Sequence, residues 1–181
     1  MKKKSIILSL IVTLIIGLYF IISYLKNETG LIKVEHVFNA RVERIWKIWN
    51  NPDSVRQWWG PKGYTSPEAK IDFREGGTYI LSMMDSKGKI SWNKGIYKKI
   101  IPNEKIYSRI FFSDENGNVV PATHYGIPGN WPNGNNLSVE FVDMGEKTKV
   151  IVEEHDIPLI MHIFAKMGWN QQFEKFEELL D

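Results

Sequence analysis

The spacing of apolar residues predicts a long amphipathic helix at the C-terminal end of the chain, over residues 156–181. Its apolar stripe consists of Trp169, Phe173, Phe176 and Leu180, continued toward the N-terminus by Ile160, Phe164 and Met167. Steps of three and four residues place such a stripe on one face of a helix. Asp156 suits the N-cap, and Pro158 suits the first turn, where its missing N–H leaves no hydrogen bond unmade. A helix with one apolar face needs an apolar surface to pack against.

Before this helix, apolar and polar side chains alternate as they do in strands. The first such run is residues 31–38, whose side chains on one face are Ile32, Val34, His36 and Phe38. Further runs, separated by turn residues, lie at 71–74, 78–84, 90–101, 105–113, 137–142 and 148–155. Gly95 interrupts the longest of them, which predicts a bulge or bend where the sheet curves.

Two short helices separate the first strand from the others. Residues 42–49 have helical spacing, and residues 52–58 form a second segment with Asn51 as N-cap and Pro52 in its first turn. The order of one strand, two short helices, about six antiparallel strands and a long helix is typical of α+β proteins whose helix packs on one face of a sheet. The long loop at residues 114–136 has the length of many lids and binding loops.

An apolar run at residues 5–25 is long enough to cross a bilayer as a helix. A cleaved signal peptide is the alternative, but its apolar region is normally shorter and no small-residue cleavage pattern follows. Three lysines precede the run, which favours a cytoplasmic N-terminus and a domain outside the cytoplasm. We therefore expect a cytoplasmic basic tail at 1–4, a single transmembrane anchor at 5–25, a tether at 26–30 and one domain at 31–181.

Composition narrows the possible partners of this domain. The chain has no cysteine, which excludes disulfides, thiol catalysis and thiolate metal sites. Removing four lysines and one glutamate of the N-terminal segment from 23 basic and 21 acidic residues leaves 19 and 20 in the domain. A domain without a basic excess is poorly suited to neutralising phosphates, so nucleic acid is not an expected partner.

Four stretches in order resemble one known family. They are residues 58–61 (WWGP), residues 72–79 (DFREGGTY), residues 112–118 (FSDENGN), and Gly168 with Trp169. The segment from Val34 to Asp53 is similar to the opening strand and helix of the same family. Together they resemble the activator-of-heat-shock-protein-90-ATPase-like branch of the START-like, or SRPBCC, superfamily, over about residues 31–180.

The resemblance implies a helix-grip fold, in which a curved antiparallel sheet wraps a long C-terminal helix and a cavity lies between them. Members of the superfamily include binders of lipids and other hydrophobic ligands, polyketide cyclases, aromatase-like proteins and co-chaperone domains. The family carries no universal catalytic residues, and one fold hosts many activities. The membrane anchor is a departure from the family pattern. A domain outside the cytoplasm cannot meet a cytosolic, ATP-driven chaperone, which counts against a co-chaperone role.

Polar residues offer little support for a metal site or for catalysis, and we predict no metal, cofactor or catalytic residue. The histidines, His36, His124, His155 and His162, lack the spacing of metal ligands. Glu153 and His155 share one face of a strand and Glu154 lies on the other, so the pleat divides this cluster. We interpret it as a polar strand end followed by a helix cap. Asp72 and Arg74 are predicted to form an ion pair that fixes the adjacent hairpin, with a place at a cavity mouth as the alternative.

Large aromatic and methionine side chains are the better candidates for a ligand site. They suit the wall or lid of an apolar pocket, although each also suits an ordinary core. The candidate binding residues are Trp58, Trp59, Met83, Trp92, Tyr107, His124, Trp131, Met161, Phe164 and Trp169.

The leading hypothesis is a membrane-tethered domain that binds a hydrophobic or amphipathic small molecule or lipid. An enzyme acting on an aromatic or cyclic substrate is the second hypothesis, with acid–base groups from Asp72, Tyr107 or His124. A module that binds an unknown protein partner is the third.

Overall fold

The computed structural model describes residues 2–180, without the side chains of residues 2–6, 8 and 9. Its elements are α1 (Lys2–Asn27), β1 (Thr29–Phe38), α2 (Val42–Asn50), α3 (Pro52–Trp58), β2 (Ala69–Ile71), β3 (Thr78–Met84), β4 (Ile90–Ile101), β5 (Lys105–Ser113), η1 (Ala122–Tyr125), β6 (Asn135–Asp143), β7 (Thr148–Pro158), η2 (Leu159–Met161) and α4 (His162–Glu177). The basic side chains predicted to form a tail at residues 1–4 lie outside the described part.

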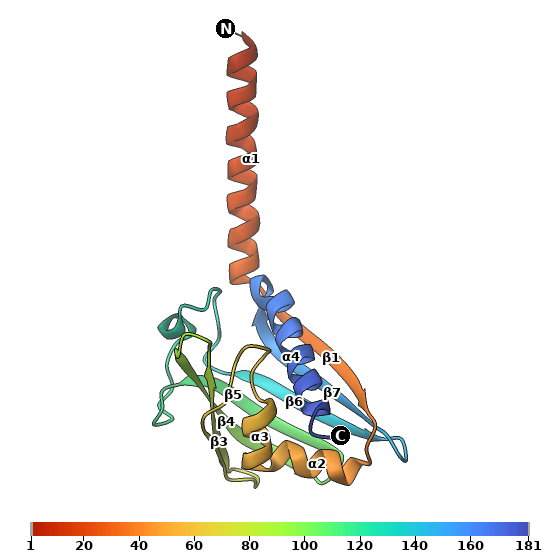
Figure 1. Cartoon of the computed structure of the whole chain (residues 1–181). Helices are drawn as coiled ribbons and strands as arrows, with labels where there is room; N and C mark the ends of the chain where they lie inside the picture. Colours follow the sequence, from red (N-terminus) through yellow and green to blue (C-terminus); the bar gives the residue numbers. More distant parts are fainter. Residues whose placement is uncertain (1, 181) are drawn as a thin grey trace.

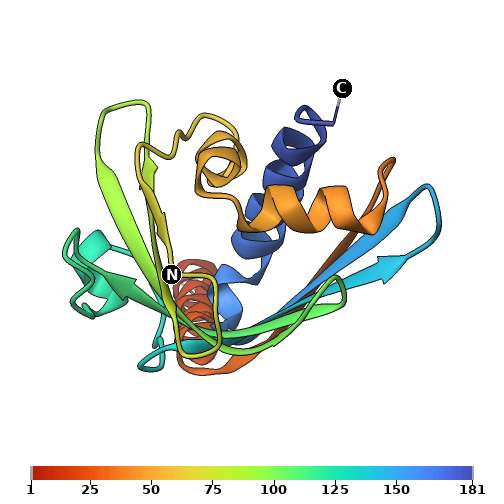
Figure 2. The ribbon, with the colours of Figure 1, turned by 90° about the horizontal axis from the view of Figure 1, so that it is seen from below.

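Seven strands form one antiparallel sheet in the order β1-β7-β6-β5-β4-β3-β2. The first strand therefore pairs with the last, and α2 and α3 carry the chain from one edge of the sheet to the other. Figure 2 shows the sheet curving around α2, α3 and α4. The α+β helix-grip architecture predicted from the sequence is confirmed.

The core lies where α4 meets the concave face of the sheet. Phe173 and Phe176 of the predicted stripe are fully buried, and Phe38 of β1 packs against both rings at centroid distances of 5.7 and 4.8 Å. The short helix α3 has the predicted cap, because the side chain of Asn51 accepts a hydrogen bond from the Ser54 N–H at 3.0 Å. Large aromatic side chains thus fix the C-terminal part of α4 on the sheet.

The long helix begins later than the sequence pattern predicted. The predicted start at Asp156 is wrong, because β7 continues to Pro158 and α4 begins at His162. Thr29 and Gly30 pair with Pro158 and Ile157, which holds these residues in the sheet, and Asp156 adopts a φ of 61°. Backbone pairing to a distant strand overrides the local helix signals of an acidic residue followed by proline.

The predicted bulge is also displaced along β4. The register shift lies between Tyr97 and Lys99, whereas Gly95 stays in register opposite Tyr79. A Cβ atom at position 95 would lie 1.9 Å from Cζ of Tyr79. Glycine is therefore required at this position because an aromatic ring of the neighbouring strand covers its Cα.

The N-terminal helix α1 projects away from the domain (Figure 1). Its stretch Leu10–Asn27 is long and apolar enough to cross a membrane, with a mean hydropathy of 1.8 and no side chain buried inside the protein. The segment 26–30, predicted as a tether, contains the last residues of α1 and the first of β1, with Glu28 alone between them. The helix and the sheet are therefore joined almost directly.

A cavity between the sheet and the C-terminal helix

A cavity of about 640 Å³ lies between the N-terminal half of α4 and the concave face of the sheet. Its walls combine side chains of α4, such as Phe164 and Trp169, with side chains of β3 to β7, such as Met83 and Ile110. Segments around residues 59–64 and 127–131 close its sides. A mainly apolar cavity of this size is typical of a site that holds one small molecule.

One carboxyl group, that of Glu154, faces this apolar cavity. Glu154 is buried, and it accepts hydrogen bonds from the indole N–H of Trp169 at 3.1 Å and from the side-chain amide of Asn135 at 3.2 Å. Burial raises the pKa of the Glu154 carboxyl from 4.5 to about 7, although both hydrogen bonds oppose the shift. The cavity wall therefore carries one carboxyl group whose charge changes near neutral pH.

The phase of β7 turns Glu154 toward the core. Val150 and Val152 are fully buried on the same face of the strand, and Glu154 follows in the next inward position. Leu137 of β6 is its register partner, and Asn135 lies two residues before Leu137 at the start of that strand. The signal for this site in the sequence was an acidic residue at a position where the alternation of the strand directs side chains toward the core.

A second wall comes from the tight turn that follows α3. Gly60 has a φ of +92°, which favours glycine, and its N–H donates to the side-chain oxygen of Gln172 at 3.0 Å. Lys175 donates to the carbonyl oxygens of Gly60 and Tyr64 at 3.0 and 3.1 Å. Desolvation lowers the pKa of this Lys175 ammonium group. The turn is thus fastened to α4 and holds the neighbouring Trp59 against the cavity.

Trp59 packs its ring edge-to-face on Trp169 at a centroid distance of 5.8 Å. Its buried indole N–H has no hydrogen-bond partner among the described residues. A buried N–H without a partner carries a desolvation penalty that an acceptor atom would relieve. Trp59 therefore holds an unpaired donor within the cavity wall, covered by protein atoms, while Glu154 supplies an acceptor.

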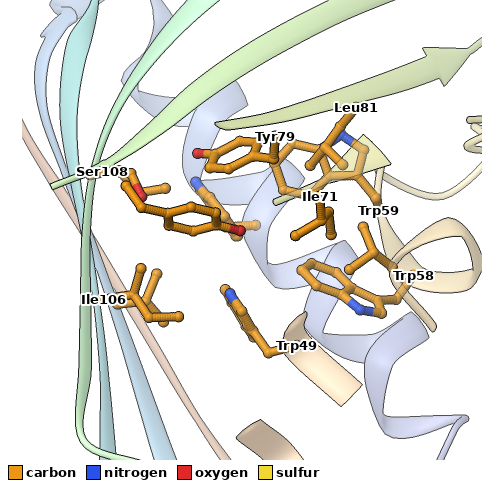
Figure 3. A pocket seen from close by; sticks show the side chains of 13 residues that line it. Trp49, Trp58, Trp59, Ile71, Tyr79, Leu81, Ile106 and Ser108 are labelled. Carbon is orange, nitrogen blue, oxygen red and sulfur yellow. The ribbon is translucent and has the colours of Figure 1, made fainter. Parts of the chain in front are cut away.

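A second, smaller cavity of about 40 Å³ lies deeper among the aromatic side chains (Figure 3). Trp59, Tyr79 and Trp169 line both cavities, so these three rings form the partition between them. The smaller space can hold about one water molecule. Burial raises the pKa of the Tyr79 hydroxyl well above its ordinary value, so this group stays neutral. The two cavities thus adjoin at Trp59, Tyr79 and Trp169.

Six of the ten residues predicted from the sequence line the larger cavity. They are Trp59, Met83, Trp131, Met161, Phe164 and Trp169. A seventh, Trp58, lines the smaller cavity and is almost completely buried. The predicted residues from the turn, from β3, from the long loop and from α4 are therefore brought together around one space.

The other three predicted residues, Trp92, Tyr107 and His124, line neither cavity. Ser91 and Asn93 of β4 face the larger cavity, so Trp92 between them points to the opposite side of the sheet. Segment η1 lies over that side, and its Tyr125 hydroxyl accepts a hydrogen bond from the Trp92 backbone N–H at 3.2 Å. His124 belongs to the same segment, next to Tyr125. Tyr107 is exposed on β5, beside the Lys105 ammonium group.

Seventeen of the 23 residues that line the larger cavity were not among the candidates predicted from the sequence. The four of them that are buried are Tyr79, Asn135, Glu154 and Gln172. Three of these four are polar. Sequence patterns identify which positions are buried, but they do not show which buried positions lie beside a cavity. Only Glu154 carried a clear signal, its inward phase after two buried valines.

The described residues around the cavity offer hydrogen-bonding groups for a ligand. Among the described residues, no group of three or more histidine, aspartate or glutamate side chains is arranged to hold a metal ion. Asp72, one of the acid–base candidates, forms an ion pair with Arg74 at 2.9 Å and lines neither cavity, as expected of a residue that fixes the hairpin. The cavity can enclose apolar surface and orient a polar end with Glu154.

Comparison with known proteins agrees with this architecture. The family model described as "Activator of Hsp90 ATPase homolog 1-like protein" matches residues 39–181. The chain belongs to this family. The matched region begins after β1 and leaves out α1, so the family assignment covers most of the domain and not the N-terminal helix. A search of curated proteins finds no match.

Solved structures share the fold of this member of the Activator of Hsp90 ATPase homolog 1-like family. A protein from Mycobacterium smegmatis aligns with a TM-score of 0.71 and 18% identity, over 83% of this chain and 90% of that one. The AHSA1 protein from Silicibacter pomeroyi aligns with a TM-score of 0.65 and 16% identity, over 83% and 96%. A protein from Staphylococcus epidermidis gives 0.64 and 16%, over 84% and 90%. At these identities the likeness establishes the fold alone.

Proposed function

We propose that this protein binds one amphipathic, lipid-like molecule in the 640 Å³ cavity and is held at a membrane by α1. The mainly apolar cavity, with the buried Glu154 carboxyl in its wall, carries the proposal. Apolar walls favour the transfer of a hydrocarbon chain out of water, and the size suits one ligand molecule.

The Glu154 carboxyl indicates how such a ligand would be oriented. Glu154 accepts hydrogen bonds when ionised and can donate one when protonated. A hydroxyl group both donates and accepts, so it complements Glu154 in either state. The hydrocarbon part would then extend along α4 toward Phe164 and Met167.

The proposed topology follows from the N-terminal helix. The span Leu10–Asn27 has the length and hydropathy of a membrane anchor. The lysines at positions 2–4 favour a cytoplasmic N-terminus. The domain would therefore lie outside the cytoplasm, against the membrane, where lipid-like ligands are concentrated.

Gly168 provides a direct test because it lines the cavity and a Cβ atom there meets nothing within 4 Å. The full chain is reconstituted in phospholipid nanodiscs and exposed to a long-chain alcohol that carries a photoreactive diazirine. Crosslinked peptides are then identified by mass spectrometry. We expect crosslinks on Met161, Phe164 or Trp169 in the wild type, and their loss in Gly168→Phe because the added ring fills the cavity.

The matched control is Asn170→Phe, which adds the same ring to an exposed position on α4. It should leave the cavity crosslinks unchanged. Crosslinks confined to α1 in the wild type and in both variants would contradict the proposal, since the cavity would then hold no lipid-like chain.

A further inference from the structure

The start of α4 carries apolar side chains that face outward. Ile163 is 78% exposed, Phe164 59% and Met167 48%. Phe164 and Met167 also line the large cavity, and Ile163 precedes Phe164 in the helix without lining it. We call these three residues the apolar rim. Single exposed apolar residues are ordinary on proteins, but a cluster within five positions at a cavity mouth marks an interaction surface.

This apolar rim lies beside the point where α1 joins the domain. The carbonyl oxygen of Lys26 accepts a hydrogen bond from the Asn130 N–H at 2.7 Å, and that of Glu28 accepts one from the Leu159 N–H at 2.9 Å. Figure 1 shows the start of α4 at the level where α1 ends. These two bonds fix which side of the domain faces the surface that α1 enters.

The opposite side of the mouth belongs to the loop that carries Asn130. Ile127 and Trp131 of this loop line the cavity. The indole N–H of Trp131 donates to the Pro128 carbonyl oxygen at 2.9 Å, and its ring packs edge-to-face on Phe112 at 5.1 Å. Both sides of the mouth are therefore attached next to the end of α1.

Building on the membrane anchor of the proposed function, we infer that the apolar rim docks into the membrane interface. A ligand then passes between the bilayer and the cavity without crossing water. The occupant of the rim is the phospholipid surface, because the apolar span ends at Asn27, beside the rim. Ile163 lies four residues after Leu159, whose N–H is bonded to Glu28.

The residues around the rim suit such a surface. Tyr24 at the end of α1 and Trp131 at the mouth are of the aromatic types enriched at membrane interfaces. Lys26 and the exposed Lys166 place positive charge near the same level, where anionic head groups attract it. The rim therefore combines an apolar centre with aromatic and basic neighbours.

The absence of cysteine from the chain allows a test by single labelling sites. Leu14→Cys, Ile163→Cys and Asn170→Cys are prepared in the full chain, labelled with a nitroxide and reconstituted in phosphatidylcholine nanodiscs. Collision rates with oxygen, which partitions into lipid, and with a water-soluble nickel chelate are measured by electron paramagnetic resonance. Asn170 is the matched control, because it is exposed and lies on the same face of α4 as Ile163, two turns farther along.

We expect the oxygen-to-nickel ratio to be several-fold higher at Ile163→Cys than at Asn170→Cys, and highest at Leu14→Cys. Phe164→Cys should give a ratio similar to that of Ile163→Cys. This second site shows that the result does not depend on the position of one label. Equal ratios at positions 163 and 170, with position 14 in lipid, would overturn the docked rim and leave the anchor standing. A water-like ratio at position 14 would overturn both. None of these readouts depends on ligand binding in the cavity.

Discussion

The raised pKa of Glu154 makes a quantitative prediction about how stability depends on pH. The carboxyl titrates near its ordinary value of 4.5 in the unfolded chain and at about 7 in the folded protein. Between these values the folded state binds more protons than the unfolded state, so the free energy of unfolding falls as pH rises. The stabilising contribution is complete below pH 4.5 and is lost once the pH has passed 7.

The size of this effect follows from the distance between the two pKa values. A tenfold difference in proton affinity is worth ~1.4 kcal/mol, so Glu154 should contribute a loss of about 3 kcal/mol across this window. Other groups also titrate there, and for that reason the prediction concerns the difference between wild type and Glu154→Gln. The glutamine side chain has a similar shape and cannot ionise.

Urea unfolding of the full chain in nanodiscs, followed by tryptophan fluorescence at several pH values from 4.5 to 8, measures this difference. All seven tryptophans lie within residues 46–169, so their emission reports on the domain and not on α1. We expect the wild type to lose about 3 kcal/mol more than Glu154→Gln as the pH rises. Glu153→Gln is the matched control, because its side chain lies on the outer face of the same strand, 3.4 Å from the Lys33 ammonium group.

Parallel pH profiles for wild type and Glu154→Gln would refute this reasoning. The carboxyl would then be hydrated in the folded protein, and the cavity wall would lack a carboxyl group whose charge changes near neutral pH. A profile shared by wild type and Glu153→Gln that is steeper than that of Glu154→Gln would locate the titration in the cavity.

Two further predictions concern stability, measured by thermal unfolding monitored by circular dichroism. Gly95→Ala should destabilise the protein by about 1–3 kcal/mol, since the alanine Cβ would overlap the ring of Tyr79. An unchanged melting temperature would show that the ring moves aside freely. Asp72→Asn should lower the free energy of unfolding by less than about 1 kcal/mol. The Asp72 and Arg74 side chains are 52% and 70% exposed, so water screens their ion pair. A larger loss would mean that the hairpin depends on this ion pair.

Sequence patterns predicted helices and strands well where interactions between residues close in the sequence determine them. The Asn51 cap and Pro52 define α3, and the stripe through Phe173 and Phe176 defines the buried face of α4. The start of α4 was missed because pairing between β1 and β7 extends to Pro158. A strand partner more than a hundred residues away leaves no local signal.

The cavity residues were only partly predictable for a related reason. Alternation along a strand assigns side chains to two faces, and it does not show which face lies under the helix. Trp92 and Met83 are both apolar residues of predicted strands, yet Met83 faces the cavity and Trp92 the opposite side, under η1. Glu154 was interpreted as part of a polar strand end, although its phase matches that of the buried Val152.

The two halves of α4 differ in a way that separates folding from binding. Phe173 and Phe176 in the second half fill the space between helix and sheet, and their burial stabilises the domain. In the first half, Gly168 has no side chain and Phe164 is largely exposed, so the apolar face continues without a packed partner. Apolar side chains without packed partners contribute little to the stability of the fold. Contact with a ligand or with a membrane surface would therefore explain the apolar sequence of the first half of α4.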